Sequence, residues 1–317
     1  MNRKLTPSRL ALISLVLGLL MITALFAGCT QSSTTTATPA ETAVPTAAAT
    51  PAATPVATVA TAAPTAVATT ATPAPSYTPS RTDIVAFTAA SLSGASPTIA
   101  SSFNKAYPPD TVSFNLDGTQ ALKTQIENGA YADVLISASN TYTNALNKEG
   151  YLVPSSVKKL TTNYVTVILP ASNPANIQSL TDLAKPGIKI AMAANTVPVG
   201  TATTAVLGNL ANDTYGQAWE NATISNVVTY ETSEPAVATK VSLGEVDAGF
   251  VYQSTANAAP SGTYQSIAIP KKDNYLQTYT IAILNQSQNK AVAQWFEQYM
   301  LSSAGQNILA QYGFTAP

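Results

Sequence analysis

From residue 83 to the C-terminus, short apolar segments alternate with amphipathic ones, and this alternation strongly restricts the possible fold. The apolar segments have the length and composition of buried strands, whereas the amphipathic segments have helical periodicity. Strands separated by helices indicate an α/β fold with mainly parallel sheets. We expect strands at 83–87, 111–115, 133–136, 164–169, 188–192, 226–229, 247–251, 266–269 and 278–284. We expect helices at 94–106, 119–128, 140–147, 179–184, 200–210, 235–243, 289–300 and 303–311.

The N-terminus has the pattern of an export signal rather than of a folded domain. Three basic residues precede an uncharged apolar stretch at 10–26, which is followed by small residues and by Cys29, the single cysteine of the chain. This pattern predicts a lipoprotein signal peptide over residues 1–28, with Cys29 lipidated as the first mature residue. An uncleaved anchor helix is the alternative, because the apolar stretch is marginally long enough to span a bilayer. Either reading holds the rest of the chain at the outer face of the cell membrane.

Residues 29–80 consist mostly of Ala, Thr, Pro, Ser and Val. Frequent prolines interrupt both helices and sheets, and the segment offers little bulky apolar surface for burial. We therefore expect a disordered linker over 29–80. Folding is then confined to residues 83–317, which are numerous enough for two lobes.

Composition excludes several classes of function. Loss of the three basic residues with the leader leaves 12 basic against 16 acidic side chains, so the chain lacks the excess positive charge that nucleic-acid binding requires. The chain has no histidine, which excludes a histidine-dependent triad and a histidine-ligated metal site. A single cysteine allows neither an intrachain disulfide nor a cysteine cluster. Asp133 and Asp247 begin apolar strands without a catalytic partner, so we expect scaffold roles, no cofactor and no enzymatic activity.

Four places where a strand gives way to a helix are candidate ligand sites, at 87–91, 115–119, 196–200 and 233–235. Ligands of open α/β sheets bind beyond the carboxyl ends of strands, where helices begin. The first turn of a helix carries unpaired N–H groups and a partial positive charge, so several helices could together hold a dianion without Lys or Arg. The alternative is that Ser91 and Thr119 serve only as N-caps of their own helices.

Six segments follow one another in a characteristic order along residues 83–317. They are Ala89-Ala90-Ser91-Leu92, Gly118-Thr119, Ala132-Asp133-Val134-Leu135-Ile136-Ser137-Ala138, Val197-Pro198-Val199-Gly200, Gly244-Glu245-Val246-Asp247-Ala248-Gly249-Phe250-Val251-Tyr252, and Gly305-Gln306 followed by Tyr312-Gly313-Phe314. This order resembles the molybdate-binding proteins of ABC importers. The resemblance implies a type II periplasmic-binding-protein fold, in which two α/β lobes close on a tetrahedral oxyanion. Lobe I would comprise residues 83–163 and 277–317, and lobe II residues 164–276.

The resemblance also implies which groups hold the oxyanion. On lobe I these are the hydroxyls of Ser91 and Thr119 with neighbouring N–H groups, and the threonine replaces a more usual serine while keeping the donor. On lobe II they are the backbone N–H groups of Val199 and Glu234 and the hydroxyl of Tyr252. A tyrosine at the end of an apolar strand is also common as a core or rim residue, which is the alternative for Tyr252.

Glu234 departs from the family pattern, which commonly has a small apolar residue there. Its carboxylate could turn to solvent or interact with the dipole of its own helix ahead of Pro235, or it could reach the metal centre as an extra oxygen ligand. Val197 stands where receptors with expanded coordination have an aspartate, which favours simple tetrahedral binding. Asp117 is ambiguous between capping a helix and holding its loop open. If either carboxylate faced the anion, phosphate would become a competitor, because a protonated phosphate needs an acceptor.

The sequence therefore predicts a monomeric, membrane-tethered, extracytoplasmic receptor that captures molybdate or tungstate and delivers it to an ABC permease. A receptor for another tetrahedral oxyanion, namely sulfate, thiosulfate or phosphate, is the alternative among binding proteins. An exported α/β hydrolase or transferase and a surface adhesin are the alternatives from other classes.

Overall fold

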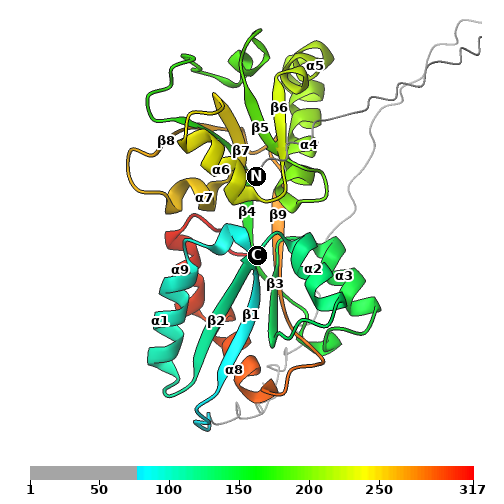
Figure 1. The fold of residues 1–317 in the computed structure, drawn as a ribbon, viewed down its shortest axis with the longest axis vertical. Coiled ribbons are helices and arrows are strands. Elements are labelled where there is room, and N and C mark those ends of the chain that lie inside the picture. The colour runs from blue at the N-terminus through cyan, green and yellow to red at the C-terminus, as the bar shows by residue number, and fades with distance from the viewer. Residues whose placement is uncertain (1–76) are drawn as a thin grey trace, which may run out of the picture. The chain divides into compact units, whose positions relative to one another are not determined.

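The computed structural model describes residues 77–317, which form two α/β lobes (Figure 1). The predicted signal peptide, Cys29 and most of the predicted linker lie outside the described residues. Within 77–317 the strands are β1 Asp83–Ala89, β2 Thr111–Asp117, β3 Val134–Ser137, β4 Lys158–Pro170, β5 Ile190–Ala193, β6 Val227–Glu231, β7 Ala248–Tyr252, β8 Tyr264–Ala268 and β9 Leu276–Ile283. The α-helices are α1 Ser96–Ala106, α2 Thr119–Glu127, α3 Asn140–Lys148, α4 Pro198–Leu210, α5 Gln217–Ser225, α6 Glu234–Ser242, α7 Gln253–Ala258, α8 Lys290–Leu301 and α9 Ser303–Gln311. Shorter turns are the 3₁₀ helices η1 Ala90–Leu92, η2 Pro154–Ser156 and η3 Leu180–Ala184, and the π-helical turn η4 Ala211–Tyr215.

Lobe I is built on the strand order β2-β1-β3-β9. β1 pairs in parallel with both β2 and β3, and β9 runs antiparallel to β3. β1 is almost entirely buried after its first residue, as expected for a central strand covered on both faces. Helices α1 and α8 pack against β2 and β9, and α2 and α3 pack against β1, β3 and β9. This arrangement brings the ends of β1 and β2 to the edge that faces the other lobe (Figure 1).

Lobe II contains β5, which lies between β6 and β7 and pairs in parallel with both. β4 continues this sheet antiparallel to β7, and β8 is antiparallel to β4. Helices α4 and α6 pack against β4, β5 and β7. The N-termini of α4 and α6 therefore follow the ends of β5 and β6, toward lobe I.

Two long strands, β4 and β9, connect the lobes (Figure 1). β4 pairs with β9 from Lys158 to Tyr164 and then with β7 from Val165, so one strand belongs to both sheets. The antiparallel pairing of β4 and β9 makes the sheets more mixed than the mainly parallel arrangement that we expected. The α/β fold with two lobes is confirmed. The lobe limits at 163/164 and 276/277 remain a prediction, which the change of partner in β4 supports.

The described chain begins with a segment that packs against lobe I. The hydroxyl of Tyr77 donates to Asp110 at 2.6 Å, and its ring lies edge-on to that of Tyr107 at 5.0 Å. Asp110 is fully buried and also accepts the backbone N–H of Thr82. The last residues of the predicted linker, 77–80, therefore contact the folded part. Between Tyr77 and the C-terminus, no helix has both the length and the apolarity that crossing a membrane requires.

Candidate functional site

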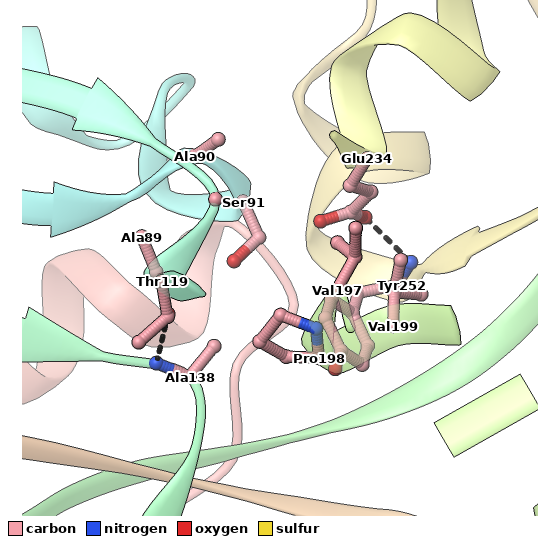
Figure 2. A pocket seen from close by; sticks show the side chains of 11 residues that line it. Ala89, Ala90, Ser91, Thr119, Ala138, Val197, Pro198, Val199, Glu234 and Tyr252 are labelled. Carbon is pink, nitrogen blue, oxygen red and sulfur yellow. Dashed lines mark hydrogen bonds between the residues drawn. The ribbon is translucent and has the colours of Figure 1, made fainter. Parts of the chain in front are cut away.

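A small cavity of about 20 Å³ lies between the lobes, where strand ends meet helix N-termini (Figure 2). Pockets for drug-sized ligands are usually roughly 300–1,000 Å³, so this cavity suits a guest of only a few heavy atoms. It is lined by Ala89, Ala90, Ser91, Gly118, Thr119, Ala138, Val197, Pro198, Val199, Glu234 and Tyr252. The structure thus brings all five residues predicted for the site together in one cavity.

Ser91 lies in η1, directly after β1, and is 5% exposed. Its Oγ is 2.7 Å from the hydroxyl oxygen of Tyr279 on β9. Burial raises the pKa of the Tyr279 phenol well above its usual value, so this group stays protonated at neutral pH. A hydroxyl can accept one hydrogen bond while donating another. Ser91 can therefore accept from Tyr279 and donate its own proton into the cavity.

Thr119 is the first residue of α2 and is buried. Its Oγ1 accepts the backbone N–H of Ala138 at 3.1 Å (Figure 2), which leaves the hydroxyl proton free to donate to a guest. Asp117, the last residue of β2, does not line the cavity. One of its oxygens accepts the backbone N–H of Gly118, and the other accepts the side chain of Gln125. The ambiguity over Asp117 is resolved, because this carboxylate holds the loop and does not face the cavity.

Val199 is the second residue of α4, after Pro198 at the first position. The backbone N–H groups of Val199 and Gly200 belong to the first turn, which has no acceptors within the helix. A Cβ at Gly200 would lie 2.1 Å from the backbone oxygen of Ala194, so only glycine lets the start of α4 come this close to the end of β5. Val199 is fully buried and lines the cavity. Its side chain is apolar, so its backbone N–H is the only hydrogen-bond donor that this residue can offer to a guest.

Glu234 is the first residue of α6, and its side chain is only 4% exposed. Its Oε1 accepts the backbone N–H of Tyr252 at 2.7 Å and the hydroxyl of Thr255 at 2.8 Å. The other carboxylate oxygen points into the cavity, toward the Ser91 side (Figure 2). The interpretation in which Glu234 turns to solvent is therefore wrong, because the carboxylate folds back over the start of its own helix. Burial raises the pKa of this carboxyl to about 7, against the opposing effect of its two hydrogen bonds.

Tyr252, the last residue of β7, is 1% exposed and forms part of the cavity wall. Its hydroxyl donates to Oε1 of Gln277 on β9 at 3.2 Å, a long hydrogen bond. A guest would therefore compete with Gln277 for this proton. Burial raises the pKa of the phenol well above its usual value, so Tyr252 remains a donor.

Sequence reasoning missed the residues that support the site from outside the strand-to-helix junctions. Tyr279 and Gln277 belong to β9, and Thr255 belongs to α7, a short helix that was not predicted. Tyr279 is more than 180 positions away from Ser91 in sequence. No local pattern links such distant residues. The only available signal was that a buried tyrosine usually needs a partner for its hydroxyl.

The cavity has the electrostatics of an anion site without any cation in its wall. Helices α2, α4 and α6 all begin at it, and each start carries a partial positive charge from its unpaired N–H groups. Neither Lys nor Arg is among the lining residues. Among residues 77–317 there is also no cluster of three or more His, Cys, Asp or Glu that could hold a metal ion. The arrangement favours a small anion that is held by neutral donors.

Comparison with known proteins agrees with this geometry. Residues 84–315 match the family described as "Bacterial extracellular solute-binding protein". The chain belongs to this family. The molybdate-binding protein ModA of Mycobacterium tuberculosis is 32% identical over 242 residues, which cover 76% of this chain and 87% of the relative. The resemblance to the molybdate-binding-protein family that the sequence predicted is therefore confirmed. A putative ABC transporter substrate-binding lipoprotein of Bacillus subtilis, YvgL, is 26% identical, covering 72% of this chain and 84% of that protein.

Solved structures show the same fold. The substrate-binding domain of a putative molybdenum ABC transporter from Clostridium difficile has a TM-score of 0.58 at 26% identity, covering 74% of this chain and 99% of that domain. The periplasmic molybdate-binding protein of Azotobacter vinelandii has a TM-score of 0.64 at 22% identity, covering 74% of this chain and 99% of the other. This chain is thus an extracytoplasmic solute-binding protein, and its relatives are solute-binding proteins rather than enzymes.

Proposed function

We propose that this protein binds one molybdate ion in the cavity between its lobes, and that tungstate, which has the same charge and shape, binds at the same place. The observation that carries the proposal is the meeting of three helix N-termini and two free hydroxyl protons at a cavity of about 20 Å³ without a cation. Neutral donors that are already in position lose little entropy when they bind a dianion. The similarity to ModA supports molybdate as the guest.

Each predicted site residue has a proposed role. Ser91 and Thr119 donate their hydroxyl protons from lobe I, helped by the N–H groups at the starts of η1 and α2. Val199 and Glu234 donate backbone N–H groups from the starts of α4 and α6. Tyr252 donates its hydroxyl once the guest displaces Gln277. The anion thereby joins donors from both lobes, which favours the closed arrangement of the lobes.

A second guest, hydrogen phosphate, is favoured by one specific observation. The cavity contains a carboxylate oxygen of Glu234, and a carboxylate accepts the proton that hydrogen phosphate carries. Sulfate and thiosulfate bring no such proton at neutral pH, so they gain nothing from this acceptor. Phosphate is therefore the competitor to test first.

We also propose how the bound anion reaches the cell. The receptor is a monomer, is held at the membrane by lipidated Cys29 after removal of residues 1–28, and delivers its guest to an ABC permease. Mass spectrometry of the protein purified from membranes tests the anchor. A diacylglyceryl-modified N-terminal peptide that begins at Cys29 is expected, and a Cys29→Ala variant should be released or retain its leader.

Calorimetric titration of the full-length protein with molybdate, tungstate, sulfate and phosphate tests the proposed guest. We expect binding of one molybdate or tungstate per chain with a sub-micromolar dissociation constant, which corresponds to more than about 8 kcal/mol. Sulfate should give no heat at similar concentrations. Tighter binding of phosphate than of molybdate would establish the second candidate, and silence from all four anions would exclude an oxyanion receptor.

A further inference from the structure

The proposed anion site does not need the negative charge that the side chain of Glu234 carries when it is ionised. The side chain is buried at the cavity wall, with Oε1 held by the N–H of Tyr252 and the hydroxyl of Thr255. The second oxygen points into the cavity and has no hydrogen-bond partner among the hydrogen bonds of residues 77–317 (Figure 2). This oxygen occupies space that an anion oxygen would approach.

Within residues 77–317, no positive side chain compensates the Glu234 carboxylate. Helix α6 packs against β4, β5, β6, β7 and η1, and of these β5 and η1 carry no titratable group. The groups that face the carboxyl are the phenols of Tyr252 and, from β9, Tyr279, both buried and neutral. The remaining titratable groups on these elements and on α6 are Lys158, Lys159 and Tyr164 on β4, Tyr230 and Glu231 on β6, and Lys240, which pairs with Glu245. None of them lines the cavity.

A dianion and an ionised carboxylate cannot share so small a cavity without strong repulsion, because charges interact strongly where water is excluded. One proton on the carboxyl removes that repulsion. It also changes the free oxygen from an acceptor into a donor directed at the guest. Thr255 and the N–H of Tyr252 bind the other oxygen, so they fix the orientation in which the protonated oxygen faces the cavity.

We propose that Glu234 carries a proton when the anion is bound and donates it in a hydrogen bond to an anion oxygen, so that a dianion that binds to the receptor with ionised Glu234 enters together with one proton from solvent. The proposal rests on the proposed function and deepens it. The free receptor with an ionised Glu234 combines with one dianion and one proton. In the resulting complex the carboxyl is neutral and the anion keeps both of its charges. Glu234 is thus a specificity residue that makes capture depend on pH.

The sign of the pH dependence follows from linkage. In the receptor without a guest, burial outweighs the two hydrogen bonds and raises the pKa of Glu234 to about 7. A neighbouring dianion raises the pKa further, because it disfavours the ionised carboxylate. Below the pKa of the free receptor the proton is already present, so affinity does not change with pH. Above it, affinity falls by about tenfold per pH unit, because each binding event must take up about one proton.

Calorimetric titration of molybdate into the full-length protein tests the proposal. At pH 8.5, titrations in buffers of different ionisation enthalpy give the number of protons taken up from the dependence of the observed heat on the buffer. We expect a value close to one per anion for the native protein, and an affinity that falls across the range from about pH 7 to about pH 9. Binding with no proton uptake and a flat pH profile would overturn the inference while leaving the proposed function intact.

Two variants locate the proton. Glu234→Gln keeps the size of the side chain and can donate from its amide, so we expect no proton uptake and an affinity independent of pH. Glu231→Gln, on β6, changes a carboxylate outside the cavity and should bind like the native protein. Proton uptake that persists in Glu234→Gln, or a large loss of affinity in that variant at every pH, would overturn the proposal. The absence of molybdate binding to the native protein would instead overturn the proposed function together with this inference.

Discussion

At the scale of single residues, the hydroxyl of Ser91 is the donor whose removal is most informative. It is buried at the end of β1 with its proton free to enter the cavity, and a hydrogen bond to a charged group is worth about 1.5–3 kcal/mol. We expect Ser91→Ala to weaken molybdate binding by that amount, a factor of roughly ten to a hundred. Calorimetry measures the change. Unaltered affinity would show that the anion does not contact this hydroxyl.

Tyr279 should act on the anion only through Ser91. In Tyr279→Phe the serine hydroxyl remains but loses the partner at 2.7 Å that orients it. We expect affinity to fall by about 0.5–1.5 kcal/mol, less than for Ser91→Ala, and the double variant to lose little more than Ser91→Ala alone. Tyr312→Phe is the control, because its hydroxyl bonds Thr98 away from the cavity. Additive losses in the double variant would show that Tyr279 contacts the anion directly.

The sequence was informative about residues that lie at strand-to-helix junctions. Ser91, Thr119 and Val199 all fall there, where chain direction and free N–H groups can be inferred from local pattern. The orientation of a side chain could not be inferred in this way. Glu234 has a sequence context typical of an exposed first-turn acid, and only the packing of α6 against β7 and η1 buries it. Its hydrogen bonds to Tyr252 and Thr255 join residues whose contact depends on tertiary structure.

At the scale of elements, the start of α4 depends on Gly200. A methyl group there would meet backbone oxygens of Ala194 and Ala193 at 2.1 and 2.5 Å, and neither can move without shifting the end of β5. We expect Gly200→Ala to destabilise the protein by about 1–3 kcal/mol and to weaken anion binding, since α4 would retreat from the cavity. Gly208→Ala in the same helix is the matched control. A methyl group at Gly208 would meet no atom within 4 Å, so this variant should be more stable by about 0.5–1 kcal/mol. Urea unfolding of both variants checks the contrast.

All nine strands between residues 77 and 317 were expected from the sequence, because each is a short apolar segment bounded by turn residues. The helices α5 and α7 were missed. α7 has six residues and follows β7 without a break, too short for helical periodicity to appear. The first half of β4, Lys158–Asn163, was also missed, because its apolar residues are outnumbered by polar ones. Lys158 and Lys159 are exposed, whereas Thr161, Thr162 and Asn163 are buried where the segment pairs with β9 between the lobes.

At the scale of the whole molecule, the two-lobe fold was predictable but the contacts that hold the lobes together were not. Two side chains of lobe I reach backbone oxygens of lobe II: Tyr142 on α3 donates to Thr196 at 2.6 Å, and Gln120 on α2 donates to Thr232 at 2.9 Å. Both side chains are half-buried on the surfaces of their helices, and no local sequence pattern indicates their partners. Both carbonyls belong to the loops that lead into α4 and α6. Closure of the lobes is therefore coupled to the same helix starts that line the cavity.

Because Tyr142 joins the two lobes, we expect this side chain to affect the rate at which the anion is released. Loss of the hydroxyl in Tyr142→Phe removes one hydrogen bond between the lobes, so the closed state should weaken by about 0.5–1.5 kcal/mol. Because association is limited by encounter with the open state, we expect release of radiolabelled molybdate to accelerate by about threefold to tenfold with little change in association. Tyr264→Phe is a matched control, since its hydroxyl donates to the backbone oxygen of Ala238 within lobe II. Equal release rates in both variants and in the native protein would mean that Tyr142 does not hold the lobes closed.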